Sequence, residues 1–526
     1  MNNRKLEETW KYHNSTKHPG MPPHYLDWDN QPIPFKIYTT LDPIEIPENL
    51  PPTNIPALTA ISTDITNTMN IECVPNLKTL GRLLYFSAGI TKKVKYPGGE
   101  IYFRAAACTG ALYHIDLYLV TCDINGLDEG VYHFGLHDFA LRKLRNGDFT
   151  DALVNATAEE PTIKSAPVTV ICASTFWRNS WKYQSRAYRH TFWDNGTILA
   201  NLLAVSSAHK IPAKIVVGFE DSPVNRLLGL DTNGEVAVSL VPLGNTKKSI
   251  EGRRQEIEAI NYETMPLSKK EVDYPAIRAM HVTSSLASQE EVKEWRSATT
   301  ESRLSLPNGK IFQLEITDDK EAVPQIPSLS IATPDPIDQI SDSIEKTILR
   351  RGSTRQFARA SITFRELSNI LYRTTHGIPA DFLSPFGSTL NDIYLIVNDV
   401  EGIPKGAYFY RREANAIELL KEGDFRKEAG HLGLGQRIPA DASVDVFFLT
   451  DLNNVLEKFG NRGYRAAQLE AGIIGGKLYL GAYARGLGAS GLTFYDDDVV
   501  RFFSPHAEGK SCMFLVALGK SVKKRG

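Results

Sequence analysis

The apolar positions along the chain switch repeatedly between the spacing of a helix and that of a strand. Helical spacing predicts helices at 75–89, ending at Gly89, and at 196–209. Alternating or continuously apolar runs predict strands, with turn residues between them, at 115–124, 130–134, 141–148, 168–174 and 213–219. The order is mixed α and β, and the first three strands predict a small meander.

One stretch of this pattern, Trp181 to Gly196, occurs a second time at Glu457 to Gly472. Identical residues stand 276 positions apart, namely Lys182, Arg186, Tyr188, Arg189 and Gly196 against Lys458, Arg462, Tyr464, Arg465 and Gly472. Composition alone would give about one identity in such a window, so the match indicates a duplication. Tyr183 becomes Phe459 and Asp194 becomes Glu470 in the second copy. The same offset relates the predicted meander to residues 392–425, so whole domains are repeated.

The repeat divides the chain into four parts. Residues 1–66 are rich in Pro, Trp, Tyr and His and predict an extended arm that wraps over a domain surface. Residues 67–246 form module one and residues 338–526 form module two, which opens with a helix at 344–351. Residues 247–337 show no counterpart in either module. They are interpreted as a linker with a helix at 288–298.

Charge and composition exclude several classes of protein. A formal net charge of −2 gives no basic field for nucleic acid or an anionic membrane. No apolar run is long enough to span a membrane and the start is too polar for a signal peptide, which predicts a cytoplasmic protein. The five cysteines are scattered without C-x-x-C spacing, so no metal site is expected. The aspartates at 496–498 are interpreted as a helix start and solvated charge.

The RGSTRQF motif, residues 351–357, is the first candidate for chemistry. Arg351, Ser353 and Arg355 offer guanidinium and hydroxyl donors beside Gly352, where backbone N–H groups can approach a ligand. Such a cluster suits a phosphate, although two nearby arginines can equally form a solvated face. The corresponding place in module one, taken as 69–76, has nothing similar.

Two further candidates lie in module one. The small-residue segment, AAACTGALYH at 105–114, would let a flat ligand lie against backbone, or is simply a tight helix start. Its module-two equivalent is altered. Lys182 beside Tyr183 could exchange protons with a substrate if burial, or the neighbouring cations Arg186 and Arg189, lowered the lysine pKa. The alternative is a surface lysine and a packed tyrosine.

Taken together, these motifs resemble the FMN-dependent nitroreductase superfamily. The match rests on RGSTRQF, on AAACTGALYHIDLYLV, on the KY-x-x-R-x-YR pattern and on LGASGLTFYDDD, and is nearest to the SagB-type dehydrogenases, which include azoline oxidases of peptide pathways. The resemblance implies an α+β fold, with helices around an antiparallel-rich sheet. It also implies a homodimer with FMN at its interface, so the tandem chain would be a fused dimer and a monomer in solution.

The resemblance also implies a set of site residues. The FMN phosphate would be held by Arg351, Gly352, Ser353 and Arg355, with backbone near Gly491, Leu492 and Thr493 and with Lys520. The isoalloxazine would face Cys108, Thr109, Gly110 and Ala111. Thr493 and Cys108 depart from the family's usual glycine and proline. Module one lacks the phosphate motif, and module two has Phe459 in place of the tyrosine and an altered small-residue segment. All three changes fall in the same one of the two expected sites, so one FMN per chain is expected.

The resulting hypothesis is an FMN-dependent oxidoreductase that oxidises an azoline-like heterocycle or peptide, with Lys182 and Tyr183 as the acid/base pair. NAD(P)H or O2 would be the co-substrate. One alternative is a nitro or quinone reductase that uses NAD(P)H. Another, from a different class, is a non-catalytic scaffold that binds a peptide in a biosynthetic complex.

Overall fold

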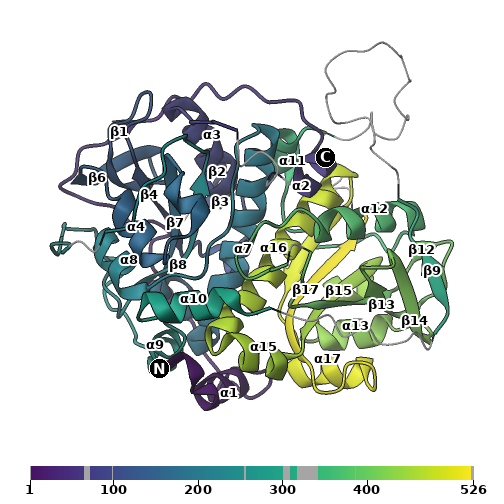
Figure 1. The fold of residues 1–526 in the computed structure, drawn as a ribbon. Coiled ribbons are helices and arrows are strands. Elements are labelled where there is room, and N and C mark those ends of the chain that lie inside the picture. The colour runs from purple at the N-terminus through teal and green to yellow at the C-terminus, as the bar shows by residue number, and fades with distance from the viewer. Residues whose placement is uncertain are drawn as a thin grey trace, which may run out of the picture.

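The computed structural model describes residues 2–63, 65, 71–96, 99–253, 256–299, 309–316, 342–385 and 387–522. Two sheets, each with its own helices, lie on either side of two long central helices, α7 (Ala187–Ala208) and α16 (Arg462–Ala484) (Figure 1). This arrangement confirms the α+β class and the two modules. None of the helices in these ranges is both long and apolar enough to cross a membrane.

Module one contains a sheet of six strands in the order β1-β6-β5-β4-β7-β8 among its described residues. All neighbours are antiparallel, which confirms the predicted meander of β4, β5 and β6. The strands are β1 (Ile44–Glu45), β4 (Ile115–Thr121), β5 (Gly130–Gly135), β6 (Ala140–Asn146), β7 (Val168–Thr175) and β8 (Glu235–Leu243). The helices are α3 (Leu77–Ala88), α4 (Thr150–Ala156), α5 (Pro161–Lys164), α6 (Phe176–Tyr183), α7 and α8 (Asp221–Leu228). The arm supplies strand β1 and helix α2 (Ala57–Ser62).

The strand predicted at 213–219 is wrong, because this segment leaves the sheet to contact module two. It keeps only isolated bridges to β8, at Ala213 and Val216. Ile215 pairs instead with Ala380 of module two, and the Asp381 carboxylate accepts the N–H groups of Val217 and Gly218.

Module two repeats the pattern in a seven-stranded sheet, β16-β17-β15-β11-β13-β14-β9, in the described ranges. Its strands are β9 (Ile311–Gln313), β11 (Asp392–Val397), β13 (Gly406–Arg411), β14 (Ala416–Glu422), β15 (Val444–Thr450), β16 (Gly488–Leu492) and β17 (Ser511–Gly519), with the short pair β10 (Ile362–Thr363) and β12 (Val400–Glu401) outside the sheet. Its helices are α11 (Ile344–Arg350), α12 (Phe364–Thr375), α13 (Arg426–Leu432), α14 (Arg437–Asp441), α15 (Leu452–Phe459), α16 and α17 (Asp496–Phe503).

The recurring glycine of the duplicated stretch marks the crossing of the central helices. A Cβ atom added at Gly196 would lie 2.5 Å from the carbonyl carbon of Gly472, and one added at Gly472 would lie 2.8 Å from the Phe192 carbonyl oxygen. Only glycine lets the two backbones approach this closely. The duplicated sequence therefore encodes the contact between the modules as well as the modules themselves.

The recurring arginines form what we call the arginine clamp, two buried clusters that each join the modules. Arg186 and Arg189 of module one bind Asp496 of module two, with nitrogen to oxygen distances of 3.1 and 2.6 Å. Arg462 and Arg465 of module two bind Asp221 of module one, the latter at 2.8 Å. All six side chains are buried.

The clamp corrects two expectations. Asp496 is not solvated, since it lies at the start of α17 in contact with Arg186 and Arg189. These two arginines in turn neutralise Asp496 across the interface, so their role is not that of free cations beside Lys182.

The arm and the linker contribute matching helices to the clamp. The arm is not extended throughout, because it contains α1 (Leu6–Ser15), whose His13 carbonyl accepts a hydrogen bond from Arg189. The linker contains the predicted helix, α10 (Gln289–Ser297), and an unpredicted one, α9 (Pro275–Thr283), where the His281 carbonyl accepts from Arg465. The linker therefore has a structural counterpart after all, in the arm.

We predict that Asp496→Asn and Asp221→Asn each destabilise the protein by about 3–5 kcal/mol, because each leaves two buried arginines without a carboxylate. Against the desolvation that burial imposes, Arg462 and Arg465 lower the pKa of Asp221 to about 2. Its stabilising effect is therefore complete above about pH 4, the unfolded pKa, and is lost as the pH falls toward 2. Thermal unfolding from pH 7 to pH 2 measures both effects.

The control is Asp497→Asn, whose exposed carboxylate pairs with Lys17 at the surface. This variant should unfold within about 1 kcal/mol of the unmodified protein. Equal stability of Asp496→Asn and Asp497→Asn would show that the buried pairs do not hold the modules together.

Candidate active site

The RGSTRQF motif of module two lies directly against the small-residue segment of module one. Arg351 follows the last residue of α11, so the helix fixes where its side chain starts. Its Nε donates to the Ala105 carbonyl at 2.9 Å, and its Nη2 donates to the Arg104 carbonyl at 2.8 Å. Two pieces that are 246 residues apart in the sequence therefore meet at the module boundary.

The arginines of this motif have no carboxylate partner within the described part of the chain. Burial lowers the pKa of Arg351, and no acidic side chain is among the groups that act on it. Arg355 is exposed and lies near Tyr183, where its charge partly offsets the increase that burial causes in the pKa of that phenol. Two guanidinium groups without a counterion, beside the Ser353 hydroxyl, make an anion site rather than a structural ion pair.

Strand β16 and the end of β17 lie next to the RGSTRQF motif. The Thr354 N–H donates to the Ala489 carbonyl at 2.9 Å, and the Ala358 N–H donates to the Lys520 carbonyl at 2.8 Å. Tyr479 of α16 joins the two pieces, because its hydroxyl bonds Ser353 Oγ at 3.2 Å and accepts the Gly491 N–H at 2.5 Å. Three predicted residues, Gly491, Leu492 and Thr493, thus lie beside the motif. The buried hydroxyl oxygens of Ser490 and Thr493 have no hydrogen-bond partner among the residues that the structure describes.

The small-residue segment is held in shape by Asp194 of α7. Its carboxylate accepts the Thr109 N–H and hydroxyl at 2.8 Å each, and the Cys108 thiol at 3.1 Å. It also contacts His114 Nε2 at 2.9 Å. The backbone at Gly110 and Ala111 is left-handed, with φ of 65° and 55°. Burial, and then the nearby Asp194 charge, raise the pKa of the Cys108 thiol well above its usual value.

Tyr183 lies at the end of α6 with its hydroxyl against this segment. A Cβ atom added at Gly110 would come within 2.8 Å of that hydroxyl oxygen. Burial raises the pKa of Tyr183 well above that of a free tyrosine, so the side chain is a neutral phenol at neutral pH. The Lys182 amine lies over the Tyr183 ring, 5.4 Å from its centroid. The predicted pair therefore lies together beside the segment.

In module two, the place that corresponds to Tyr183 is covered by another side chain. Phe459, which replaces Tyr183, is buried and packs edge-on against Trp295 of α10, with ring centroids 5.8 Å apart. Glu470 holds its own segment as Asp194 does, accepting the N–H groups of Leu390 and Asn391. The framework of a second site is therefore kept, while an apolar side chain of the linker covers the position of the tyrosine.

The module-one place that corresponds to RGSTRQF is earlier than 69–76. Helix α2 precedes α3 as α11 precedes α12, and α2 and α11 both pack on the central helices. The equivalent stretch therefore begins at Thr63, and no arginine occurs from there to Asn76. Asp64 and residues 66–70 lie outside the described residues.

Sequence reasoning missed Asp194 and Tyr479 as parts of the site. For Asp194 a signal was present, since its carboxylate is kept as Glu470 at the same offset. No such signal was present for Tyr479, because module one has no counterpart of the pair, Ser353 and Gly491, that Tyr479 connects in module two.

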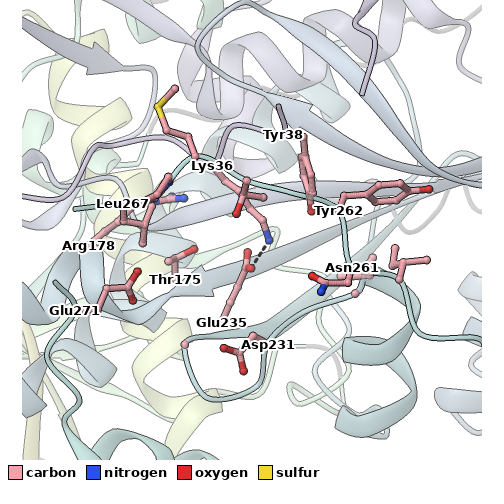
Figure 2. Close-up of a pocket in the computed structure, with 17 residues that line it drawn as sticks. Lys36, Tyr38, Thr175, Arg178, Asp231, Glu235, Asn261, Tyr262, Leu267 and Glu271 are labelled. Atoms are coloured by element: carbon pink, nitrogen blue, oxygen red, sulfur yellow. Dashed lines mark hydrogen bonds and ion pairs between the residues drawn. The ribbon is translucent and has the colours of Figure 1, made fainter. Parts of the chain in front are cut away.

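A pocket of about 230 Å3 lies behind the small-residue segment, between module one, the arm and the linker (Figure 2). Lys36 of the arm points to Glu235 at the start of β8, with 2.5 Å between the charged atoms. Arg178 lines the pocket, pairs with Asp116 at 2.9 Å and donates to the Tyr113 carbonyl at 3.3 Å. Arg178 thus connects this pocket to the small-residue segment at Tyr113.

Comparison with known proteins agrees with the geometry. Residues 348–520 match the model of the nitroreductase family. Over 178 residues the chain is 28% identical to a protein of Methanocaldococcus jannaschii with the provisional name nitroreductase, covering 33% of this chain and 88% of that one. A crystal structure from Anabaena variabilis, of a protein with the same provisional name, matches 98% of this chain and 99% of its own at 24% identity and a TM-score of 0.73.

The chain therefore contains a nitroreductase family domain at residues 348–520, and the nitroreductase fold extends over nearly its whole length. These matches support an oxidoreductase.

We predict that Asp194→Asn lowers the pKa of the Cys108 thiol, because it removes the charge that, after burial, raises it most. Each unit of decrease gives roughly ten times more thiolate at a fixed pH below the pKa. The measurement is the rate of iodoacetamide labelling at Cys108 from pH 7 to 10, read by peptide mass spectrometry. The midpoint of the profile separates a pKa change from easier access.

Glu470→Gln is the matched control, since it makes the same change in module two. It should leave the Cys108 profile unchanged. If Asp194→Asn gives the same midpoint as the unmodified chain, then Asp194 does not set the electrostatics of the segment.

Proposed function

We propose that the protein is an FMN-dependent dehydrogenase that uses one FMN per chain and oxidises an azoline-like ring in a peptide. The observation that carries the proposal is the meeting of two arginines without counterions, Arg351 and Arg355, with the small-residue segment and Tyr183 of the other module. A phosphate on one side and a flat ring on the other are the two parts of a flavin nucleotide.

The residues present fit FMN. Arg351, Ser353 and Arg355 would hold the phosphate, joined by the backbone at Gly352, and the partnerless hydroxyls of Ser490 and Thr493 would gain polar neighbours. Lys520, exposed beside the motif, adds positive charge. Cys108 to Ala111 would lie against the isoalloxazine, where the raised pKa keeps Cys108 a neutral thiol. The cofactor, when bound, supplies the acceptor for a hydride.

Lys182 and Tyr183 are proposed as the acid/base pair. Converting an azoline to an azole removes a hydride from one ring carbon and a proton from its neighbour, so a protein group must take the proton. Tyr183, a neutral phenol against Gly110, can hold a ring heteroatom by donating a hydrogen bond. Lys182, over its ring and partly exposed, would take up the proton as a neutral amine and then release it to water.

A second candidate is the reduction of nitro compounds or quinones with NAD(P)H, which the family match at 348–520 favours. It would use the same FMN site but has less need for an acid/base pair positioned on module one. Under either function the contacts expected between two subunits are made within the chain, and the protein is proposed to be a monomer. O2 or NAD(P)+ would reoxidise the dehydrogenase.

We predict that Lys182→Ala and Tyr183→Phe each lower the turnover of a thiazoline-containing peptide by about 10² to 10⁴, the usual cost of losing a positioned acid/base group. FMN should stay bound, because neither residue belongs to the phosphate site. The measurement is azole formation by mass spectrometry, beside NADH-dependent reduction of menadione by the same preparations.

Lys458→Ala provides the internal control, since Lys458 is the duplicate of Lys182 next to Phe459. It should leave azole formation nearly unchanged. Inactivation by Lys458→Ala but not by Lys182→Ala would place the chemistry in the other copy. Menadione reduction without any azole formation would favour the second candidate.

A further inference from the structure

We infer that the β2–β3 hairpin of module one is the docking surface for an acidic, extended segment of the peptide substrate. The hairpin consists of β2 (Ile90–Tyr96) and β3 (Gly99–Arg104). The inference rests on the proposed function and adds the substrate class that the site would accept.

One face of this hairpin is apolar and exposed. Val94 lies opposite Ile101, and Lys92 lies opposite Phe103, so these side chains share a face with Tyr96. Val94, Tyr96, Ile101 and Phe103 are between 37% and 49% exposed. The opposite face is anchored, because the Tyr102 ring packs on Phe35 of the arm with centroids 5.2 Å apart. An apolar face on a fixed support, which no described residue covers, indicates a surface for a partner.

The edges of the hairpin also present backbone N–H and C=O groups with which another strand could pair. Among the described residues, β2 and β3 pair only with each other, so each has one edge whose N–H and C=O groups face no strand. Such an edge binds an extended peptide as an additional strand, while the exposed face selects its alternate side chains.

The charge of the hairpin selects an acidic partner. Lys92, Lys93 and Lys95 lie on β2, and all three are exposed. Glu100 on β3 is the one carboxylate of the two strands, and it lies 3.4 Å from Lys95. Lys92 is thus left on the apolar face, while Lys93 lies on the opposite face, 5.7 Å from the centre of the Tyr102 ring. A segment that alternates acidic and apolar residues would match both features.

The position of the hairpin connects it to the candidate active site. Its last residue, Arg104, and the next, Ala105, supply the two carbonyls that bind Arg351. A peptide strand paired with the hairpin would therefore lie next to the small-residue segment. Module two has no hairpin in the described residues between α12 and β11. The docking element is present only beside the copy that has kept Tyr183.

The test uses the full chain and a fluorescein-labelled peptide of roughly ten residues, a typical strand length, that alternates Glu and Val. Fluorescence anisotropy should show binding, and Val94→Ser with Ile101→Ser should weaken it by about tenfold or more. Reversing the lysines, in Lys92→Glu with Lys93→Glu, should weaken it similarly. The same peptide with Lys in place of Glu should bind about tenfold more weakly than the acidic one.

The matched control is Val282→Ser on α9, which changes a similarly exposed valine elsewhere. It should bind like the unmodified chain. Equal binding by the hairpin variants, or equal binding of both peptides, would overturn the inference. So would a dimer, seen by sedimentation, that the Val94→Ser and Ile101→Ser changes convert to a monomer, because a second copy would then be the occupant.

Oxidation of a minimal thiazoline, too short to reach the hairpin, separates this inference from the proposed function. The hairpin variants should retain bound FMN and oxidise the minimal compound at the unmodified rate. If the unmodified chain does not oxidise the minimal compound, that result contradicts the proposed function and not the inference about the hairpin. Peptide binding would then still report on the hairpin.

Discussion

Two carboxylates, each buried between two arginines of the opposite module, determine how this chain is assembled. Moving an ion out of water costs several kcal/mol, so Asp221 and Asp496 are tolerated only where the arginines reach them. Those arginines also donate to backbone on α1 and α9, which requires the arm and the linker to be in place. With Gly196 against Gly472, the clamp fixes the boundary at which the candidate site is formed.

A nearly symmetric framework can carry one site instead of two because binding and framework use different residues. Asp194 and Glu470 shape their segments alike, and both arginine pairs are complete. What differs is confined to a few positions. Arg351 and Arg355 occur only in module two, while Phe459 lies under Trp295 where module one has Tyr183. The contacts between the modules are therefore the same in both copies, although Trp295 of the linker is buried against Phe459 in only one of them.

The sequence predicted the modules and the meander because the duplication supplied a register, and the family resemblance predicted that the RGSTRQF motif meets residues 105–114. It could not assign Arg186 and Arg189, since their partner Asp496 is about 310 residues away and buried charges look like surface charges in a sequence. The segment 213–219 has strand composition but is drawn to Ala380 and Asp381 by tertiary contacts. Helix α1 was missed because its stability comes from packing on the clamp.

The central claim is that each chain builds one functional flavin site from halves of two modules. The most direct measurement is the amount of FMN bound per chain after saturation and gel filtration, determined from flavin released by denaturation. The account predicts about one equivalent for the unmodified chain, and close to none for Arg351→Ala with Arg355→Ala in a protein that remains folded, since two charge-assisted contacts of roughly 1.5–3 kcal/mol each are lost. Two equivalents per chain, or one that survives both substitutions, would contradict it.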